Sequence, residues 1–189
     1  KKEYLFLKKK YNIEPINSSL WKFLRLRPAN FPTIRIAQLA SLAPGLSELM
    51  NILRQVDNVK TLKSFFETEL NNYWNSHYVF DKLSTVRNKK MGESSIDVLL
   101  INAVLPFIFF YAKSNGLDKI KDIVLTLYTQ LKSEQNRYVK FWSNNNILSK
   151  SAYDSQSLLE LSTELCLNKK CLECEIGLRV LRGGHENKK

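Results

Sequence analysis

Glycine and proline are scarce in this chain, and their scarcity limits what it can fold into. The 189 residues include six glycines and five prolines. Barrels and sandwiches need many tight turns, which these two residues usually supply, so the low counts favour long helices. Hydrophobic residues make up 44% of the chain, which is enough for a core, and the length fits one domain. We therefore expect an all-α protein.

The most apolar stretch, about 95–113, predicts the centre of the fold. Ser94 or Ser95 can cap a helix that continues to about Ser114. Because the stretch is apolar almost all round, we expect a buried helix, kinked near its middle by Pro106. The predicted fold class is thus an irregular multi-helix bundle around this central helix.

Shorter helical patterns flank the central stretch on both sides. Asn30 is the predicted N-cap of one of them, with Pro32 in its first turn. Residues 71–92 are expected to form a long ordered loop, because their many aromatic residues do not suit a disordered linker. We expect a single helical domain over residues 1–182 and a flexible tail over 183–189. Helices are expected at 3–13, 32–43, 47–56, 61–70, 118–131, 134–143 and 151–166.

The formal net charge of +11 is spread unevenly along the chain. Residues 1–43 carry +7, residues 44–165 carry +1 and residues 166–189 carry +3. A basic region attracts polyanions by releasing their counterions, and clustering of the charges strengthens this attraction. The charge pattern therefore predicts nucleic acid as a partner. The alternative is that the lysines are solvated and only aid solubility.

Three arginines, Arg25, Arg27 and Arg35, stand close to the start of a predicted helix. Arginine binds phosphate or carboxylate through two parallel hydrogen bonds, and a helix N-terminus adds free N–H donors. We interpret the group as an anion or nucleic-acid site, with further contacts to the phosphate backbone from lysines. The alternative is that the arginines lock a loop by binding backbone carbonyls or buried carboxylates. The lysines are Lys8, Lys9, Lys10 and Lys22.

All three cysteines fall within nine residues, as Cys166-x4-Cys171-x2-Cys174. Thiolates this close together suit zinc or an iron–sulfur cluster, with His185, or less well His77, as a fourth ligand. They also suit a helix junction, where cysteines pack as small buried hydrophobes, and redox chemistry is a third alternative. We predict no cofactor, with zinc or an iron–sulfur cluster as the alternative.

Two other polar groups are candidates for catalysis. His77 and Asp81 lie four residues apart, so the carboxylate can orient the imidazole if both lie on one helical turn. Glu134 and Asp154 form a possible carboxylate pair. A packed histidine and helix-capping carboxylates are the alternatives. No nucleotide-binding loop, zinc-protease or serine-hydrolase motif occurs in the sequence.

Several long strings together resemble an uncharacterised bacterial family built around a domain of unknown function. The resemblance implies that the chain corresponds to the C-terminal half of longer family members. Their N-terminal half carries a string similar to the acidic core of restriction-endonuclease-like nucleases, and this chain contains no such string. The motifs are RLRPxNFP and C-x4-C-x2-C, and the strings are RLRPANFPTIRIAQLA (25–40), YWNSHYVF (73–80), INAVLPFIFFYA (101–112), SEQNRYVKFW (133–142) and YDSQSLLELSTELCLNKKCLECEIG (153–177).

These observations lead to three readings of function. The first is a non-catalytic basic accessory domain that binds nucleic acid within a larger, nuclease-like protein. The second is a structural or protein-interaction domain that docks an acidic partner or its own N-terminal half. The third is a metal-dependent enzyme with its site at the cysteines, or an enzyme using His77. We expect a cytoplasmic protein without a membrane partner, because the run Val98 to Ala112 is short and is interrupted by Asn102 and Pro106.

Overall fold

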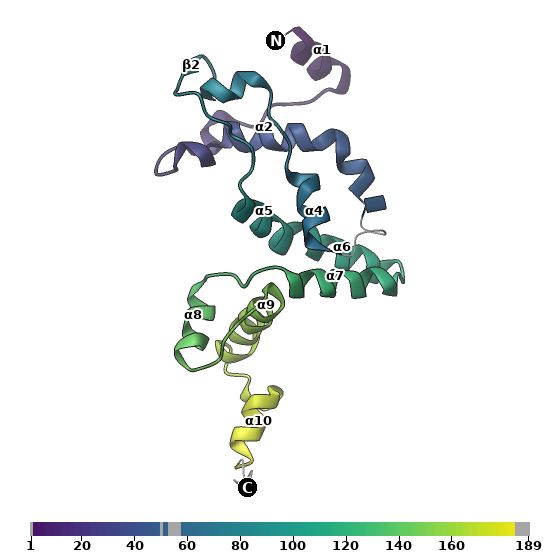
Figure 1. Ribbon diagram of the computed structural model, residues 1–189, viewed down its shortest axis with the longest axis vertical. Coiled ribbons are helices and arrows are strands. Elements are labelled where there is room, and N and C mark those ends of the chain that lie inside the picture. The colour runs from purple at the N-terminus through teal and green to yellow at the C-terminus, as the bar shows by residue number, and fades with distance from the viewer. Residues whose placement is uncertain (1, 50, 53–57, 184–189) are drawn as a thin grey trace. The chain divides into compact units, whose positions relative to one another are not determined.

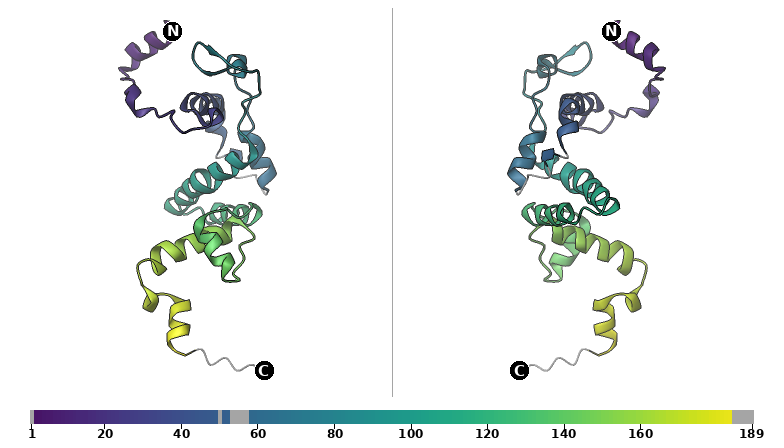
Figure 2. Two further views of the ribbon diagram at one scale, coloured as in Figure 1. Left: turned by 90° about the vertical axis from the view of Figure 1, so that its left-hand side faces the viewer. Right: turned by 90° about the vertical axis from the view of Figure 1, so that its right-hand side faces the viewer.

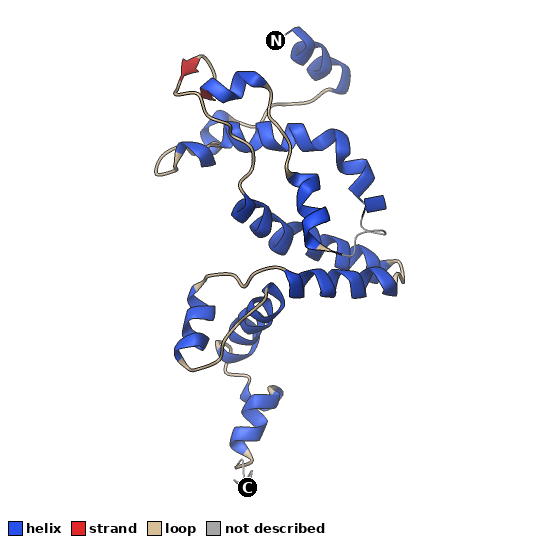
Figure 3. Cartoon of the chain, viewed as in Figure 1, coloured by secondary structure: helices blue, strands red, loops and turns tan. Residues whose placement is uncertain are grey.

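The computed structural model describes residues 2–49, 51–52 and 58–183, and this part of the chain is all-α apart from one small hairpin (Figure 3). Its contacts gather into two compact units, while the single domain over residues 1–182 stays a prediction. The first unit comprises Lys1–Leu46 and Glu67–Met91, and the second comprises Ser47–Phe66 and Gly92–Lys189. Most of the predicted tail, residues 184–189, lies outside the described residues.

The first unit combines short helices with a hairpin that the sequence did not predict. The hairpin lies within the predicted loop 71–92, and β1 pairs with β2 in antiparallel fashion. Helix α2 packs against β1, where the hydroxyl of Thr33 donates a hydrogen bond to the carbonyl of Tyr78. The elements are α1 (Lys2–Tyr11), 3-10 turns at Ser18–Leu20, Pro28–Asn30 and Ala43–Glu48, α2 (Pro32–Leu42), a 3-10 turn at Asn72–Ser76, β1 (His77–Val79) and β2 (Lys82–Leu83).

Helix α2 begins as predicted at Pro32, but its N-cap is Phe31 and not Asn30. The side chain of Asn30 does not bind the amides of the first turn. Its Oδ1 instead accepts a hydrogen bond from the guanidinium of Arg35, at 2.7 Å. A charged donor on the next turn thus takes the oxygen that we expected to cap the helix.

Buried polar groups hold much of the first unit together. Lys89 is only 6% exposed, and its Nζ donates to the carbonyls of Trp74 and Asn75, each at 2.7 Å. The ammonium also lies over the ring of Tyr78, 4.2 Å from its centroid. The Lys89 carbonyl in turn accepts a hydrogen bond from Gln38 of α2, at 2.9 Å. One lysine thus connects α2 to the segment that carries the hairpin.

The second unit has an apolar helical core. Helices α6 and α7 lie side by side (Figures 1 and 2), and α4 packs on α5, where the ammonium of Lys63 lies 2.6 Å from a carboxylate oxygen of Asp97. Val124, Leu127 and Leu131 are buried at the predicted spacing. The helices are α4 (Val59–Phe66), α5 (Glu93–Leu99), α6 (Leu105–Ser114), α7 (Asp118–Gln130), α8 (Arg137–Asn144), α9 (Ala152–Glu160) and α10 (Glu175–Leu181).

The predicted central helix exists, and Pro106 perturbs it in a defined way. Helices α5 and α6 are joined without a break by a π-helical segment, Leu100–Val104, in which the amide of Leu105 donates to the carbonyl of Leu100. In this register the carbonyl of Ile101 faces residue 106, where proline has no N–H to donate. The hydroxyl of Tyr128 on α7 donates to that carbonyl instead, at 2.8 Å. The helix begins after the N-cap Gly92, so neither predicted serine caps it.

The same helix is less buried than predicted. Leu100, Leu105 and Ile108 are fully buried, but Phe107 and Phe110 are 63% and 68% exposed. The apolar pattern runs all round the helix, while the neighbouring helices cover only part of its surface.

The continuous helix Glu93–Ser114 also corrects our argument about membranes. It has 22 residues, and its most apolar 18-residue window has a mean hydropathy of 1.9 with 33% of the window buried. By length and composition it can cross a bilayer, so the exclusion based on a short interrupted run is wrong: the helix continues through Asn102 and Pro106. Core helices of soluble proteins meet the same criteria, so this property of the described residues alone does not indicate a membrane protein.

Polar side chains cap the C-terminal helices. Asn136 caps α8 by accepting from two amides at 3.0 Å, and Ser151 with Asp154 forms a capping box on α9. A second π-helical segment, Leu161–Cys166, follows α9, and α10 was not predicted. Half of the predicted helix 47–56 lies outside the described residues, and Ser47 and Glu48 belong to a 3-10 turn. Four leucines of the last predicted helix, at 158, 159, 161 and 165, are half-buried.

Candidate functional site

The loop before α2 presents two of the three predicted arginines to solvent. Phe23 and Phe31 pack edge to face, with ring centroids 5.1 Å apart, and the chain between them forms a tight loop. Arg25 lies in the left-handed region, at φ 64°, and Arg27 precedes the 3-10 turn Pro28–Asn30. Both side chains are exposed, and neither forms an ion pair with a described carboxylate. These two guanidiniums are therefore available to an external anion.

Arg35 has a different role from the other two arginines. Its guanidinium donates to Oε1 of Gln38 at 2.9 Å and to Oδ1 of Asn30 at 2.7 Å. Gln38 is buried and also binds the carbonyl of Lys89, so Arg35 belongs to the network that holds the first unit together. It positions the loop, as in the alternative interpretation of the arginines, while Arg25 and Arg27 remain candidates for ligand contact.

The predicted lysines lie on α1 and in the segment that follows it. Lys8 forms a 3.6 Å ion pair with Glu14, and Lys10 lies over the ring of Tyr11 at 5.1 Å. Lys9 and Lys22 are exposed. Helix α1 buries none of its residues and exposes Tyr4, Leu5 and Phe6 beside the lysines.

The two units also differ in net charge. The first unit has 13 lysines and arginines against five carboxylates, a net charge of +8. The second has 16 against 13, a net charge of +3. Segment 67–91, which joins residues 1–46 in the first unit, adds three exposed cations that were not among the predicted site residues. They are Lys82, Arg87 and Lys90.

His77 and Asp81 do not form the predicted pair on a helical turn. His77 opens strand β1 and stacks on Tyr73, with ring centroids 3.9 Å apart and ring planes 5° apart. Its Nδ1 lies 2.8 Å from the carbonyl of Tyr73. Asp81 occupies the hairpin turn at φ 58°, and its amide donates to the hydroxyl of Tyr73 at 2.9 Å. The histidine is therefore packed, as in the alternative interpretation.

Glu134 and Asp154 also do not pair with each other. Glu134 accepts hydrogen bonds from the side-chain amides of Asn102, at 3.0 Å, and of Gln156. Asp154 accepts from the amides of Lys150 and Ser151, at 2.9 and 3.0 Å. These two amides lower the pKa of the Asp154 carboxyl below its ordinary range. Both carboxylates thus stabilise helix ends and helix contacts.

The three cysteines border one small apolar pocket of about 140 Å³. Cys174 is buried, at 8% exposure, while Cys166 and Cys171 are exposed. The interpretation of the cysteines as buried hydrophobes therefore fits Cys174 alone. No group of three or more histidines, cysteines or carboxylates that could hold a metal ion occurs among the described residues, and His185 lies outside them. A Cβ at Gly177 would lie 2.4 Å from the Cys171 carbonyl, so this contact requires glycine.

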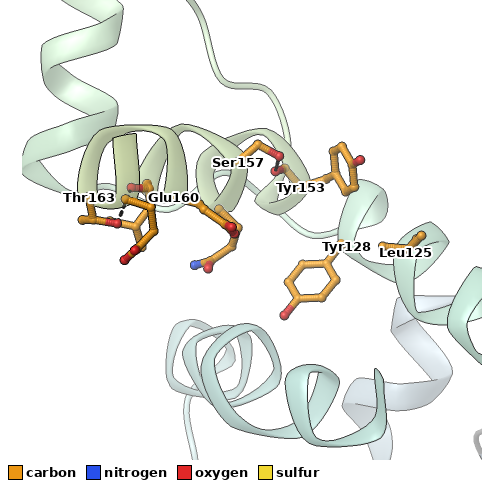
Figure 4. A pocket seen from close by; sticks show the side chains of 9 residues that line it. Leu125, Tyr128, Tyr153, Ser157, Glu160 and Thr163 are labelled. Atoms are coloured by element: carbon orange, nitrogen blue, oxygen red, sulfur yellow. Dashed lines mark hydrogen bonds between the residues drawn. The ribbon is translucent and has the colours of Figure 1, made fainter. Parts of the chain in front are cut away.

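A larger pocket of about 550 Å³, which we did not predict, lies between α7 and α9 (Figure 4). Leu125 and Tyr128 of α7 line it together with Tyr153, Ser157 and Glu160 of α9. Burial raises the pKa of Tyr128 to about 12, and the charge of Glu134 acts in the same direction, so this phenol stays protonated. The Tyr128 hydroxyl already donates to the Ile101 carbonyl, so this proton is not available to a ligand in the pocket.

Comparison with known proteins identifies a family but no activity. A family model described as a protein of unknown function, DUF2851, matches residues 1–137. No curated protein matches the chain, and no solved structure does. The matched residues contain the arginines and the hairpin, and they end before the cysteine motif. Because the match covers well over half of the sequence, the chain belongs to the family DUF2851.

Proposed function

We propose that the chain is a non-catalytic, basic helical module that binds nucleic acid through the first unit. The observation that carries the proposal is the net charge of +8 on that unit, with Arg25 and Arg27 exposed and unpaired among the described residues. Phosphates that replace small counterions on such a surface release those ions into solution, which favours binding at low salt. The resemblance adds that the module serves a larger, nuclease-like protein.

The proposed contacts follow from the environment of each cation. Arg25 and Arg27 can each present two parallel donors to a phosphate, because nothing described occupies their guanidiniums. Lys9 and Lys22 are exposed and add point charges, while Lys8 shares its charge with Glu14. Phosphate contacts of this kind carry no base sequence, so the binding is independent of sequence.

The salt dependence of binding tests the proposal. Affinity for a labelled oligonucleotide should fall steeply between about 50 and 200 mM salt, as expected when several phosphates are neutralised. Arg25→Ala combined with Arg27→Ala should reduce the slope of log K against log salt by roughly 1.4–1.8, because each phosphate contact contributes about 0.7–0.9. Lys113→Ala with Lys119→Ala removes the same charge from exposed positions of the second unit and should leave the slope unchanged. Failure to bind at low salt would contradict the proposal.

A protein-interaction role is the second candidate, and the exposed rings of α6 favour it. Phe107 and Phe110 lie on the nearly neutral second unit, where an aromatic surface suits a protein contact. A photoreactive phenylalanine analogue in place of Phe110 should crosslink to a protein partner in cells, whereas the analogue at the exposed position of Lys113 should crosslink less. Labelling of lipid alone would assign the face to a bilayer and exclude the protein-interaction role for it.

A further inference from the structure

Four aromatic rings gather on the hairpin segment of the first unit, which we term the aromatic hairpin (residues 72–83). Tyr73 and His77 stack face to face, and Phe80 packs against Trp74 with ring centroids 5.3 Å apart. Tyr73 also contacts Trp74 and Phe80, at 5.4 and 6.3 Å between centroids. Phe80 stands in the turn between β1 and β2 and is 67% exposed, while Tyr73 is 36% exposed. The cluster thus ends in a ring that the described residues leave open to solvent.

Hydrogen bonds hold this cluster in one arrangement. The side chain of Asn71 accepts from the amide of Tyr73 at 3.0 Å and so caps the 3-10 turn. The hydroxyl of Tyr73 accepts from the amide of Asp81 and fixes the turn next to Phe80. The buried ammonium of Lys89 also donates a hydrogen bond to the carbonyl of Trp74. The rings are therefore ordered before any ligand arrives, which lowers the entropy lost on binding.

The charges near the rings indicate which ligand fits them. Residues 71–91 contain four cations and one carboxylate, Asp81. Three of the cations, Lys82, Arg87 and Lys90, are exposed, and Leu83 adds an exposed aliphatic side chain. An open ring on a basic, rigid turn suits a ligand with flat aromatic groups on a negatively charged chain. Single-stranded nucleic acid has this composition, whereas the bases of a duplex are stacked on each other and closed to such a ring.

We propose that the aromatic hairpin is a base-stacking platform, with Phe80 as the ring that contacts a base, and that the chain therefore prefers single-stranded nucleic acid. The proposal rests on the proposed function, since the arginines and lysines of the first unit supply the phosphate contacts. It adds a contact to the bases, which phosphate binding does not require. Stacking accepts any base, so the preference is for strandedness and not for sequence.

Three oligonucleotides of equal length test the platform by fluorescence anisotropy with the whole chain. They are a thymidine single strand, an abasic single strand with the same phosphates, and a duplex. The thymidine strand should bind roughly 5- to 150-fold more tightly than the abasic strand, the range expected for stacking of one base. Phe80→Leu should bring the thymidine strand close to the abasic level and leave abasic binding unchanged, while Phe80→Tyr should retain the difference. Val86→Ala, which removes an exposed aliphatic side chain outside the aromatic hairpin, is the matched control and should change neither affinity.

The possible outcomes separate this inference from the proposed function. Equal, salt-dependent binding of the thymidine and abasic strands, unaffected by Phe80→Leu, would overturn the platform and leave phosphate binding intact. Tighter binding of the duplex than of the thymidine strand would also overturn it. Absence of binding to all three at low salt would overturn both proposals. Because Phe80 is mostly exposed, its variants should keep the circular dichroism spectrum and urea midpoint of the unmodified chain, so lost binding reports a lost contact.

Discussion

The two units of this protein are held together by different forces. The second has a continuous apolar core, from Val59 and Leu62 of α4 to Leu127 of α7. In the described part of the first unit, buried apolar residues are few, and Gln38 and Lys89 are buried among them. Its elements are joined by side chains that donate to backbone carbonyls. Hydrophobic periodicity in a sequence therefore indicates an apolar core, whereas a network of polar side chains and backbone groups leaves no periodic signal in the sequence.

The units also differ in what they offer to other molecules. The first has a net charge of +8, exposed arginines and an exposed aromatic turn, while the second is nearly neutral and exposes the rings of α6. Both proposals on nucleic acid concern the first unit for this reason.

The apolar core of the second unit should respond most strongly to truncation. Leu105→Ala removes a fully buried side chain and should lower the free energy of unfolding by roughly 2–5 kcal/mol. Phe110→Ala, on the same helix but 68% exposed, is the matched control and should cost less than about 1 kcal/mol. Urea denaturation measures both. A loss below about 0.5 kcal/mol for Leu105→Ala would show that this helix is not the core.

The polar network of the first unit should depend on Lys89. Lys89→Met keeps much of the apolar stem but removes two charge-assisted hydrogen bonds to carbonyls that each keep one backbone N–H partner, which should cost about 1–3 kcal/mol. Lys90→Met, at the exposed neighbouring position, should change stability by less than about 0.5 kcal/mol. The protection of the amides in residues 72–79 against hydrogen exchange measures the effect on this segment. Equal protection in both variants would mean that the ammonium does not hold this segment.

The same variant gives a pH test. Burial lowers the pKa of the Lys89 ammonium below its ordinary 10.5, and the charge of Arg87 acts in the same direction. Just below pH 10.5 the unfolded chain therefore binds more protons at this position than the folded chain, so stability should rise as the pH rises towards 10.5. Because Lys89→Met lacks this gain, its deficit relative to the unmodified chain should widen over the same range. A deficit that narrows would contradict the direction of the shift.

The smallest expected effect concerns the π-helical segment of the central helix. Tyr128→Phe leaves the carbonyl of Ile101 without a donor and should cost roughly 1–2 kcal/mol. Pro106→Ala restores an N–H at the position that this carbonyl faces, so the cost of Tyr128→Phe should shrink by at least about 0.5 kcal/mol in that background. A double-mutant cycle from urea melts measures the coupling. Strictly additive losses of stability would show that the Tyr128 hydrogen bond does not depend on Pro106.

Local signals predicted some of the helix ends. Helix α6 ends at Ser114 and α7 begins at Asp118, as predicted, with Gly116 at φ 65° between them. Asn30 was the wrong cap because Arg35 takes its oxygen. The hairpin at 77–83 was read as a loop because its strands are only three and two residues long, which is too short for an alternating pattern to show.

The candidate site could be predicted only in part. The basic character of the N-terminal region follows from counting charges, and Arg25 and Arg27 are exposed in keeping with an anion site. Spacing alone did not distinguish Arg35 from the other two, although it binds side chains of its own unit. The His77–Asp81 interpretation failed because four-residue spacing indicates neighbours only on a helix, and this segment is a hairpin.

Local sequence patterns were sufficient to predict the all-α class, most of the helices and the basic character of residues 1–43, because propensity, apolar spacing and formal charge are properties of short segments. The tertiary structure decided which groups these segments use and which they leave free. In the folded chain, the buried ammonium of Lys89 donates to backbone carbonyls. The hydroxyl of Tyr128 donates to the Ile101 carbonyl, for which Pro106 has no N–H. The ring of Phe80 remains exposed in the turn of its hairpin. Each of these outcomes depends on hydrogen bonds and coverage between residues far apart in the chain, which no local pattern encodes.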